Sequence, residues 1–204
     1  MGFFIFNKFD IRYMKYLIAG LGNIGNEYAH TRHNIGFDVV AAFVFKHGGE
    51  FKNDRLAYHA EVKIKGRTVV CVCPTTYMNL SGKAVQYWLG KEKIPLERSL
   101  TILDDLALPL SKMRIKPAGS DGGHNGLRSI QAHLNTTAYP KLRFGIGNDF
   151  PKGMQADFVL GKWNKDEEAL VKLKIEKATE AIETFLFQGI EAAMNEINNK
   201  EYTL

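Results

Sequence analysis

Residues 15–23, KYLIAGLGN, begin the pattern from which the architecture of this chain follows. A short apolar run that ends in glycines predicts a buried strand followed by a tight loop. Similar apolar runs recur at residues 68–73, 99–103 and 142–146, and segments with helical apolar spacing lie between them. Alternating strands and helices predict an α/β domain with helices on both faces of one twisted sheet.

Residues 58–65 alternate between apolar and polar side chains and meet residues 68–73 across Gly66-Arg67. This arrangement predicts an antiparallel hairpin, so we expect the sheet to be mixed. A further short strand is predicted at residues 113–116. Apolar periodicity and Ser81 as a possible N-cap predict helices over residues 36–46, 81–89, 125–134, 167–187 and 190–197.

The chain has 204 residues, of which 45% are hydrophobic, which is enough for one sizeable core. We therefore expect a single compact domain over residues 14–204, preceded at residues 1–13 by an extension or a misassigned start. Cys71 and Cys73 alternate along one predicted strand, and we expect reduced core thiols, which are typical of a cytoplasmic protein. No apolar run in the sequence reaches membrane-spanning length.

The charge is mildly basic, with 27 Lys and Arg against 22 Asp and Glu, a net charge of +5. This balance suits a phosphate-bearing partner without requiring one. Basic residues crowd around the loop at residues 119–126, which leads into a predicted helix whose free amides favour an anion. They are Lys112, Arg114, Lys116, Arg128, Lys141 and Arg143.

Four polar segments, GLGN, TRHN, YMNL and GGHNG, carry the residues that suggest chemistry, and two of them directly follow predicted strands. Because ligands bind at the carboxyl ends of strands in open α/β sheets, we expect these groups to meet at one edge. His33 can move a proton near neutral pH, Asp104 can orient it, and asparagine amides can position a substrate. The set predicts a hydrolytic site in which water is the nucleophile, with no metal and no cofactor.

Each of these features also has an interpretation that involves no hydrolytic site. Residues 20–25 match the dinucleotide pattern G-x-G-x-x-G, but the following residues lack helical periodicity, and no second strand ends in an acid about twenty residues on. His33 alone is compatible with a loop or capping role, Met78 with a core position, and residues 119–126 with a mobile loop. The convergence of several signals on one sheet edge favours the hydrolytic site.

With GLGN, TRHN, TTYMNLSG, LDDL, GGHNGL and LRFGIG in this order, the chain resembles the bacterial peptidyl-tRNA hydrolase family. The resemblance runs from about Met14 to near the C-terminus. It implies a compact α/β domain with a mixed twisted sheet, of the phosphorylase/hydrolase-like type. It also implies hydrolysis of the ester that joins a peptide to the tRNA 3′ end, by a cytoplasmic monomer that needs no protein partner, membrane or metal.

The resemblance assigns a role to each matching residue. His33 corresponds to the general base and Asp104 to the carboxylate that orients it. Residues that position the substrate or the water correspond to Asn23, Met78, Asn79 and Asn125. Tyr28 corresponds to a tyrosine on the tRNA side of the cleft, and Lys116 and Arg143 to basic residues that clamp a tRNA phosphate.

Three positions depart from the family pattern: Ile24 replaces a usual proline, and Leu103 and Ala107 replace a usual histidine and acid around Asp104. We expect Asp104 to keep its role in a less polar setting. Three rival functions remain open. They are an RNA-binding relative that has lost catalysis, a nucleotide-cofactor oxidoreductase, and a hydrolase of some other small ester.

Overall fold

The computed structural model describes residues 14–204, so the predicted extension at residues 1–13 lies outside the described residues. Within these residues, seven strands form one sheet in the order β2-β3-β4-β1-β5-β7-β6. The strands are β1 (Lys15–Gly20), β2 (Lys52–Asp54), β3 (Ala57–Ile64), β4 (Arg67–Pro74), β5 (Ser99–Asp105), β6 (Met113–Lys116) and β7 (Lys141–Gly145). The central strands β4, β1, β5 and β7 run parallel, whereas β2, β3 and β6 are antiparallel to their neighbours. The predicted mixed α/β sheet is confirmed.

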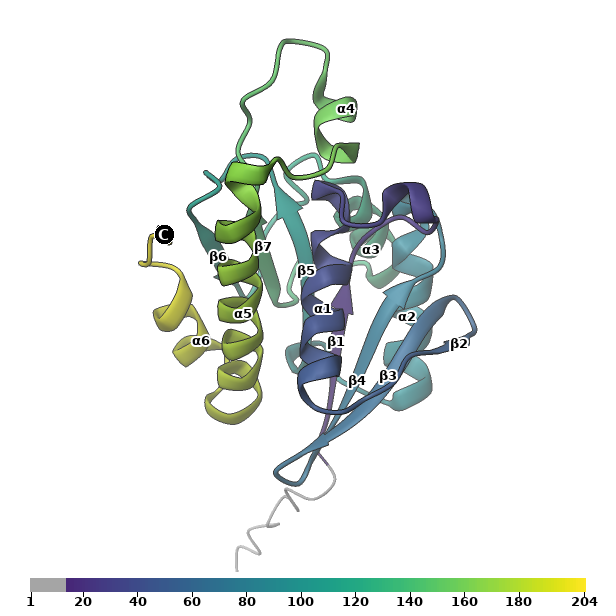
Figure 1. Ribbon diagram of the computed structural model, residues 1–204. Coiled ribbons are helices and arrows are strands. Elements are labelled where there is room, and N and C mark those ends of the chain that lie inside the picture. The colour runs from purple at the N-terminus through teal and green to yellow at the C-terminus, as the bar shows by residue number, and fades with distance from the viewer. Residues whose placement is uncertain (1–13) are drawn as a thin grey trace, which may run out of the picture.

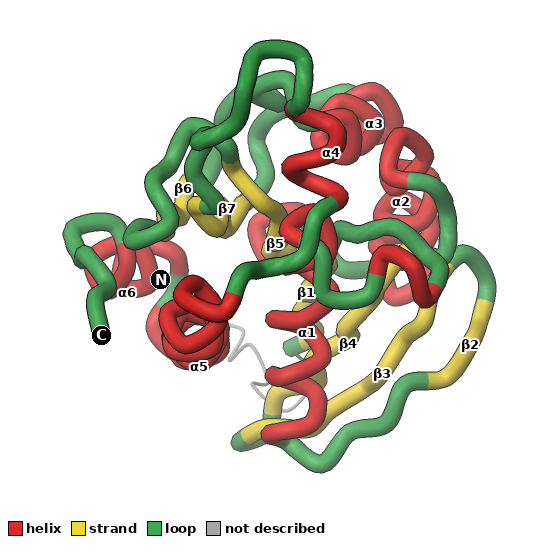
Figure 2. Tube along the Cα trace, turned by 45° about the horizontal axis from the view of Figure 1, so that its top comes forward, coloured by secondary structure: helices red, strands yellow, loops and turns green. Residues whose placement is uncertain are grey.

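Helices cover both faces of the sheet (Figures 1 and 2). One face packs against α1 (Ile35–Lys46), α5 (Lys165–Gln188) and α6 (Ile190–Ile197), and the other against α2 (Ser81–Glu92) and α3 (Asn125–Leu134). A short helix, α4 (Gln155–Leu160), stands with its preceding loop beyond the carboxyl ends of the parallel strands (Figure 1). The sheet therefore separates two apolar cores and leaves that end for a site.

Alternation along each strand divides its side chains between the two cores. In β1, Ile18 joins the α1–α5 core, whereas Leu17 and Ala19 join the α2–α3 core. Cys71 and Cys73 of β4 both face the α1–α5 core, where they are buried and free. Burial raises the pKa of both thiols. The prediction of reduced core cysteines on one face is confirmed.

Several local predictions need correction. The hairpin turn is Lys65-Gly66 rather than Gly66-Arg67, because both residues have the positive φ (45° and 81°) that a type I′ turn requires. Ser81 does not cap α2, since Leu80 is the N-cap and the Ser81 hydroxyl donates to the Met78 carbonyl at 2.9 Å. The elements β2 and α4 were not predicted, because they are short and contain no fully buried side chain that would create an apolar period.

A close approach of α1 to the sheet positions the turn that precedes the helix. Gly20 ends β1 and Gly36 lies in the first turn of α1, and a Cβ atom on either one would clash with backbone across the contact. On Gly36 the clash would involve the Ile102 carbonyl of β5. Two glycines therefore allow the residues just before α1, including His33, to reach the end of β5.

Candidate active site

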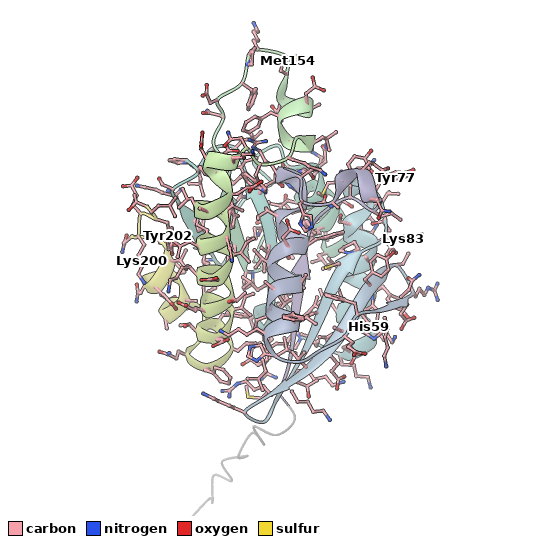
Figure 3. All side chains as sticks on the ribbon, viewed as in Figure 1. His59, Tyr77, Lys83, Met154, Lys200 and Tyr202 are labelled. Carbon is pink, nitrogen blue, oxygen red and sulfur yellow. The ribbon has the colours of Figure 1, made fainter. Side chains whose placement is uncertain are left out.

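A cleft of about 1120 Å³ lies at the carboxyl ends of the parallel strands. Its walls come from the loop after β1, the turn before α2, the β5–β6 loop, the start of α3 and the segment from residue 148 to 160. Most of the predicted site residues line it: Asn23, His33, Met78, Asn79, Asp104, Asn125 and Arg143. Tyr77 also lines the cleft and is exposed at its rim (Figure 3).

The structure brings His33 and Asp104 together although 71 residues separate them. His33 belongs to a 3-10 turn, Arg32–Asn34, that leads directly into α1. Its Nδ1 atom lies 2.9 Å from Oδ1 of Asp104, which is buried near the end of β5. With Nδ1 bonded to a carboxylate, the Nε2 atom of the ring is the one left to accept a proton.

A second histidine, His124, contacts the same carboxylate and was not among the predicted site residues. Its Nε2 lies 3.0 Å from Oδ1 of Asp104. His124 is the N-cap of α3, and its Nδ1 accepts the Leu127 amide hydrogen at 3.4 Å, so Nε2 carries the proton that is donated to Asp104. The sequence shows a histidine before a predicted helix, but only the tertiary structure shows which carboxylate it faces.

Burial and charge act in opposite directions on these groups. Burial disfavours protonation of His33, but the adjacent Asp104 carboxylate, by charge and hydrogen bonding, outweighs it and raises the pKa of His33 above 6.5. Burial would raise the pKa of Asp104, but the two imidazoles that donate to it hold that pKa well below its ordinary value. Asp104 is therefore ionised at neutral pH.

Asn34 fixes the backbone of Asn23 by a pair of hydrogen bonds. The side-chain NH₂ of Asn34 donates to the backbone carbonyl of Asn23 at 2.9 Å. The side-chain oxygen of Asn34 accepts from the backbone N–H of Asn23 at 2.8 Å. The side-chain oxygen of Asn23 accepts from the Met78 backbone N–H at 3.2 Å. The side-chain NH₂ group of Asn23 has no hydrogen-bond partner among residues 14–204. Asn34 is buried, and it supports Asn23, a role that the sequence did not assign to this asparagine of the TRHN segment.

Met78 and the two remaining asparagines form part of the wall. Met78 is buried, and its sulfur lies so close to Gly126 that a Cβ atom there would clash with it. Asn125 is the first residue of α3, and its side-chain oxygen accepts from Arg128 at 3.3 Å. Asn79 lines the cleft from the turn before α2. Amide groups thus surround the pocket next to His33.

The residues predicted to contact tRNA lie at different distances from the cleft. Tyr28 is half-buried and does not line it. Arg143 lines it, but its guanidinium is paired with Asp105 at 3.1 Å and donates to the Ser120 carbonyl at 2.7 Å. Lys116 is exposed on β6, opposite Lys141 of β7.

Two basic residues of the predicted cluster, Lys116 and Lys141, differ in their exposure to solvent. On β7, Phe144 pairs with Asp104 and Lys141 pairs with Lys116, so Lys116 lies three residues, about 10 Å, along the strands from the level of Asp104. Lys141 is buried, and its ammonium donates to the Thr137 and Tyr139 carbonyls. Lys141 is therefore closed to a surface ligand, whereas Lys116 is exposed.

The three departures from the family pattern leave the His33–Asp104 contact intact. Leu103 faces the α2–α3 core, because it alternates with Asp104 along β5. Ala107 lines the cleft, and its amide donates to the Asp105 carboxylate at 2.8 Å. Ile24 is exposed in the loop after β1. The carboxylate that bonds His33 is thus retained.

His33, Asp104 and His124 are the one group of three possible metal ligands among the residues that the structure describes. Their ligand atoms lie within 4.8 Å of one another. All three are already joined by hydrogen bonds in an arrangement suited to proton transfer. Independence from metals stays a prediction, which hydrolysis of N-blocked aminoacyl-tRNA in the presence of EDTA would test.

Comparisons with known proteins show which family the chain belongs to. A family model described as peptidyl-tRNA hydrolase matches residues 17–203. The chain belongs to the peptidyl-tRNA hydrolase family. A peptidyl-tRNA hydrolase from Parabacteroides distasonis is 53% identical over 187 residues, 92% of this chain and 100% of the relative. One from Cytophaga hutchinsonii is 52% identical over 188 residues, with the same coverage.

Solved structures of the family share the fold. The peptidyl-tRNA hydrolase of Acinetobacter baumannii matches with a TM-score of 0.87 at 36% identity, covering 93% of this chain and 97% of that chain. A peptidyl-tRNA hydrolase crystallised with N-propanol matches with a TM-score of 0.86 at 37% identity. Similarity over the whole domain makes this chain a member of an ester hydrolase family and does not favour an inactive RNA-binding relative.

The dinucleotide-binding alternative fails on geometry. The residues after Gly20-Leu21-Gly22 lead into a 3-10 turn, Asn26–Tyr28, and α1 begins only at Ile35. The glycine motif therefore does not open a helix, as pyrophosphate binding requires. Within the described part of the chain, none of the helices combines the length and apolarity needed to cross a bilayer.

Proposed function

We propose that this protein hydrolyses the ester between a peptide and the tRNA 3′ end, with water activated by His33. The observation that carries the proposal is the 2.9 Å contact between Nδ1 of His33 and Asp104 at the base of an amide-lined cleft. Asp104 holds the Nδ1–H tautomer and stabilises the imidazolium that forms during the reaction. Membership of the hydrolase family supports the substrate class.

In the proposed reaction, Nε2 of His33 takes a proton from water as the water oxygen attacks the ester carbonyl. The amide NH₂ groups of Asn23 and Asn125 stabilise the oxyanion of the tetrahedral intermediate. His33 then returns the proton to the departing ribose oxygen, giving a free peptide acid and a tRNA 3′-hydroxyl. A positioned base contributes about 10²–10⁴-fold, and each oxyanion donor about 10²–10³-fold.

We assign substrate binding to groups around this centre. Met78 and Asn79 hold the peptide main chain, and Tyr28 faces the tRNA. Lys116 supplies a phosphate contact outside the cleft, because it is exposed and no acidic partner lies beside it in the described chain. Arg143 joins it by exchanging its Asp105 carboxylate for a phosphate. We propose that the protein acts as a cytoplasmic monomer, without a metal or cofactor.

The direct test replaces two histidines by the same residue. His33→Asn removes the proposed base, whereas His30→Asn removes an exposed histidine that pairs with Asp38 at 3.0 Å in a similar manner. Asparagine tolerates the left-handed backbone of His30 (φ 59°). Hydrolysis of N-blocked aminoacyl-tRNA is measured with EDTA present. We expect His33→Asn to lose about 10²-fold or more and His30→Asn to retain full activity.

The same assay separates the rival functions. A wild-type protein that binds tRNA without releasing the amino acid would support the RNA-binding alternative. Equal hydrolysis of simple esters and of aminoacyl-tRNA would support a small-ester hydrolase. Activity lost in EDTA and restored by a divalent metal would overturn the metal-free mechanism.

A further inference from the structure

Arg32 precedes His33 and carries a buried cation that the proposed reaction does not use. Its side chain does not line the cleft, and burying a guanidinium is costly unless it is paired and hydrogen-bonded. The partners of Arg32 therefore indicate which part of the protein it holds.

Those partners all lie between α4 and the first turn of α5. One guanidinium nitrogen, Nη1, donates to the Lys162 carbonyl at 2.7 Å, and Nη2 donates to the Glu167 carboxylate at 2.7 Å. The group also lies over the rings of Phe158 and Trp163, at 4.4 Å and 5.0 Å from their centroids. Arg32 thus bridges α4, the residues after it and the first turn of α5.

The backbone adds a second connection between the same parts. The Arg32 amide donates to the Gly161 carbonyl at 3.0 Å, and Thr31 forms an isolated β-bridge with Lys162. The turn that carries His33 is therefore joined to the residues just after α4 by both main-chain and side-chain contacts.

The segment held in this way forms one wall of the cleft. Phe150, Val159 and Leu160 line the cleft, and Phe150 packs on Phe158 with ring centroids 4.8 Å apart. The outer loop of this segment projects beyond the body of the protein, with Met154 at its tip (Figure 3). Such a projecting loop depends on contacts at its base for its position.

We propose that Arg32 is a positioning residue that fastens the wall segment, residues 148–162, to the turn carrying His33. This inference rests on the proposed function, since the wall encloses the substrate beside the general base. Arg32 acts through Phe158 on Phe150, and through Gly161 and Lys162 on the end of α4. Loss of Arg32 frees the wall, so the substrate binds more weakly while the His33–Asp104 contact persists.

Two variants weaken the connection in different ways. Arg32→Met removes the charge, the fork of donors and the cation–π contacts. Glu167→Gln is milder: its amide oxygen still accepts the Asn164 backbone N–H, which keeps the capping box of α5, but the ion pair to Arg32 is lost. If Arg32→Met does not fold, Glu167→Gln tests the same connection.

A matched control exists at the opposite end of the sheet. Arg67 begins β4 and lies over the Phe187 ring at 4.7 Å, so Arg67→Met also removes an arginine stacked on an aromatic ring. Any general loss of stability appears in this control, which does not touch the cleft.

Two measurements are made on each intact protein. Steady-state kinetics with N-blocked aminoacyl-tRNA give KM and kcat separately, and limited trypsin digestion gives the cleavage rate after exposed Lys152 in the outer loop. For Arg32→Met we expect KM and the Lys152 cleavage rate each to rise about tenfold, the scale of one lost charge-assisted hydrogen bond, with kcat changing much less. Glu167→Gln should shift both in the same direction by a smaller factor, and Arg67→Met should shift neither.

The outcomes distinguish this inference from the proposed function. Wild-type KM and wild-type cleavage at Lys152 in a folded Arg32→Met protein, or in Glu167→Gln if Arg32→Met does not fold, would overturn the inference. The same holds if Arg67→Met changes both quantities equally. Failure of the wild-type protein to hydrolyse the substrate would overturn the proposed function, whereas the digestion rates would still report whether Arg32 holds the wall.

Discussion

One carboxylate oxygen, Oδ1 of Asp104, accepts hydrogen bonds from two imidazoles. His33 approaches it from the turn before α1, and His124 from the N-cap of α3. Because the carboxylate is buried, the hydrogen bonds that it accepts are stronger than they would be in water. The proton affinity of the proposed base is therefore raised by a carboxylate 71 residues away in the chain.

Replacing Asp104 by Asn should change the pH dependence of the reaction as well as its rate. The base is active when neutral, so kcat/KM rises with pH through the pKa of His33, which lies above 6.5 in the wild type. Without the carboxylate, burial dominates and the rising limb moves to lower pH. We also expect the plateau of kcat/KM to fall about 10²-fold or more. Profiles of kcat/KM measured between about pH 5 and 9 test this.

An unchanged rising limb in Asp104→Asn would mean that another group is the base. The histidine at position 30 serves as a control here too, because His30→Asn should leave the limb in place. The raised pKa of His33 also contributes to stability, fully below pH 6.5, and this contribution is lost as pH rises through the folded pKa.

At the level of elements, the site depends on how closely α1 approaches β1 and β5. The contact runs through Gly20 and Gly36, where neither glycine has room for a side chain. The turn before α1 is thereby held against the end of β5, where Asp104 lies. Close packing of this kind transmits any displacement of the helix to His33.

Gly36→Ala should therefore impair both stability and activity. The added methyl group would clash with the Ile102 carbonyl, and we expect a loss of about 1–3 kcal/mol in the free energy of unfolding. Gly90→Ala is the control: Gly90 lies in α2 with open space around its Cα, and we expect a gain of about 0.5–1 kcal/mol there. Urea unfolding measures the change in the free energy of unfolding for each variant, and the aminoacyl-tRNA assay measures the activity of Gly36→Ala. Equal effects of the two substitutions would contradict the packing argument.

At the level of the whole molecule, one fully buried lysine joins α5 to the loop after β5 and to the end of β7. Lys174 donates to the Leu110 carbonyl at 2.5 Å and to the Gly145 carbonyl at 2.8 Å, and its ammonium lies 3.7 Å from the Phe144 ring centroid. Burial lowers its pKa to about 6. Folding above that pH therefore requires Lys174 to release a proton.

Stability should consequently rise with pH through this group. Between the folded pKa of about 6 and the unfolded value of 10.5, the unfolded chain binds a proton that the native state lacks. This difference contributes about 1.4 kcal/mol of stability per pH unit. We expect Lys174→Met to remove that part of the slope between about pH 7 and 9, as read from urea unfolding. Lys172→Met, at an exposed position of the same helix, should retain it.

The basic surface should make tRNA binding depend on salt. Because phosphate contacts release counterions, KM for aminoacyl-tRNA should rise with salt concentration. We expect Lys116→Gln to raise KM at low salt and to reduce the slope of log KM against log salt by about one. Lys63→Gln, at an exposed site on the antiparallel β3, should leave the slope unchanged. A slope unaffected by Lys116→Gln would remove Lys116 from the tRNA surface.

Apolar periodicity was enough to predict the order and type of most elements, because it is a local property of the chain. It placed β1, β5 and α1 within one or two residues, and it pointed to His33 and Asp104 through loops that follow strands. Short exposed elements such as β2 and α4 escaped prediction, since they bury too little apolar surface to show a period.

Which polar groups meet could be read only from the folded protein. His124 shares the carboxylate of Asp104, Asn34 holds Asn23, and Lys141 is buried while Lys116 is exposed. These facts depend on strand order and on the approach of α1 and α3 to one sheet edge. Hydrogen bonds and burial arise between residues distant in the chain, so their partners leave no periodic trace in the sequence.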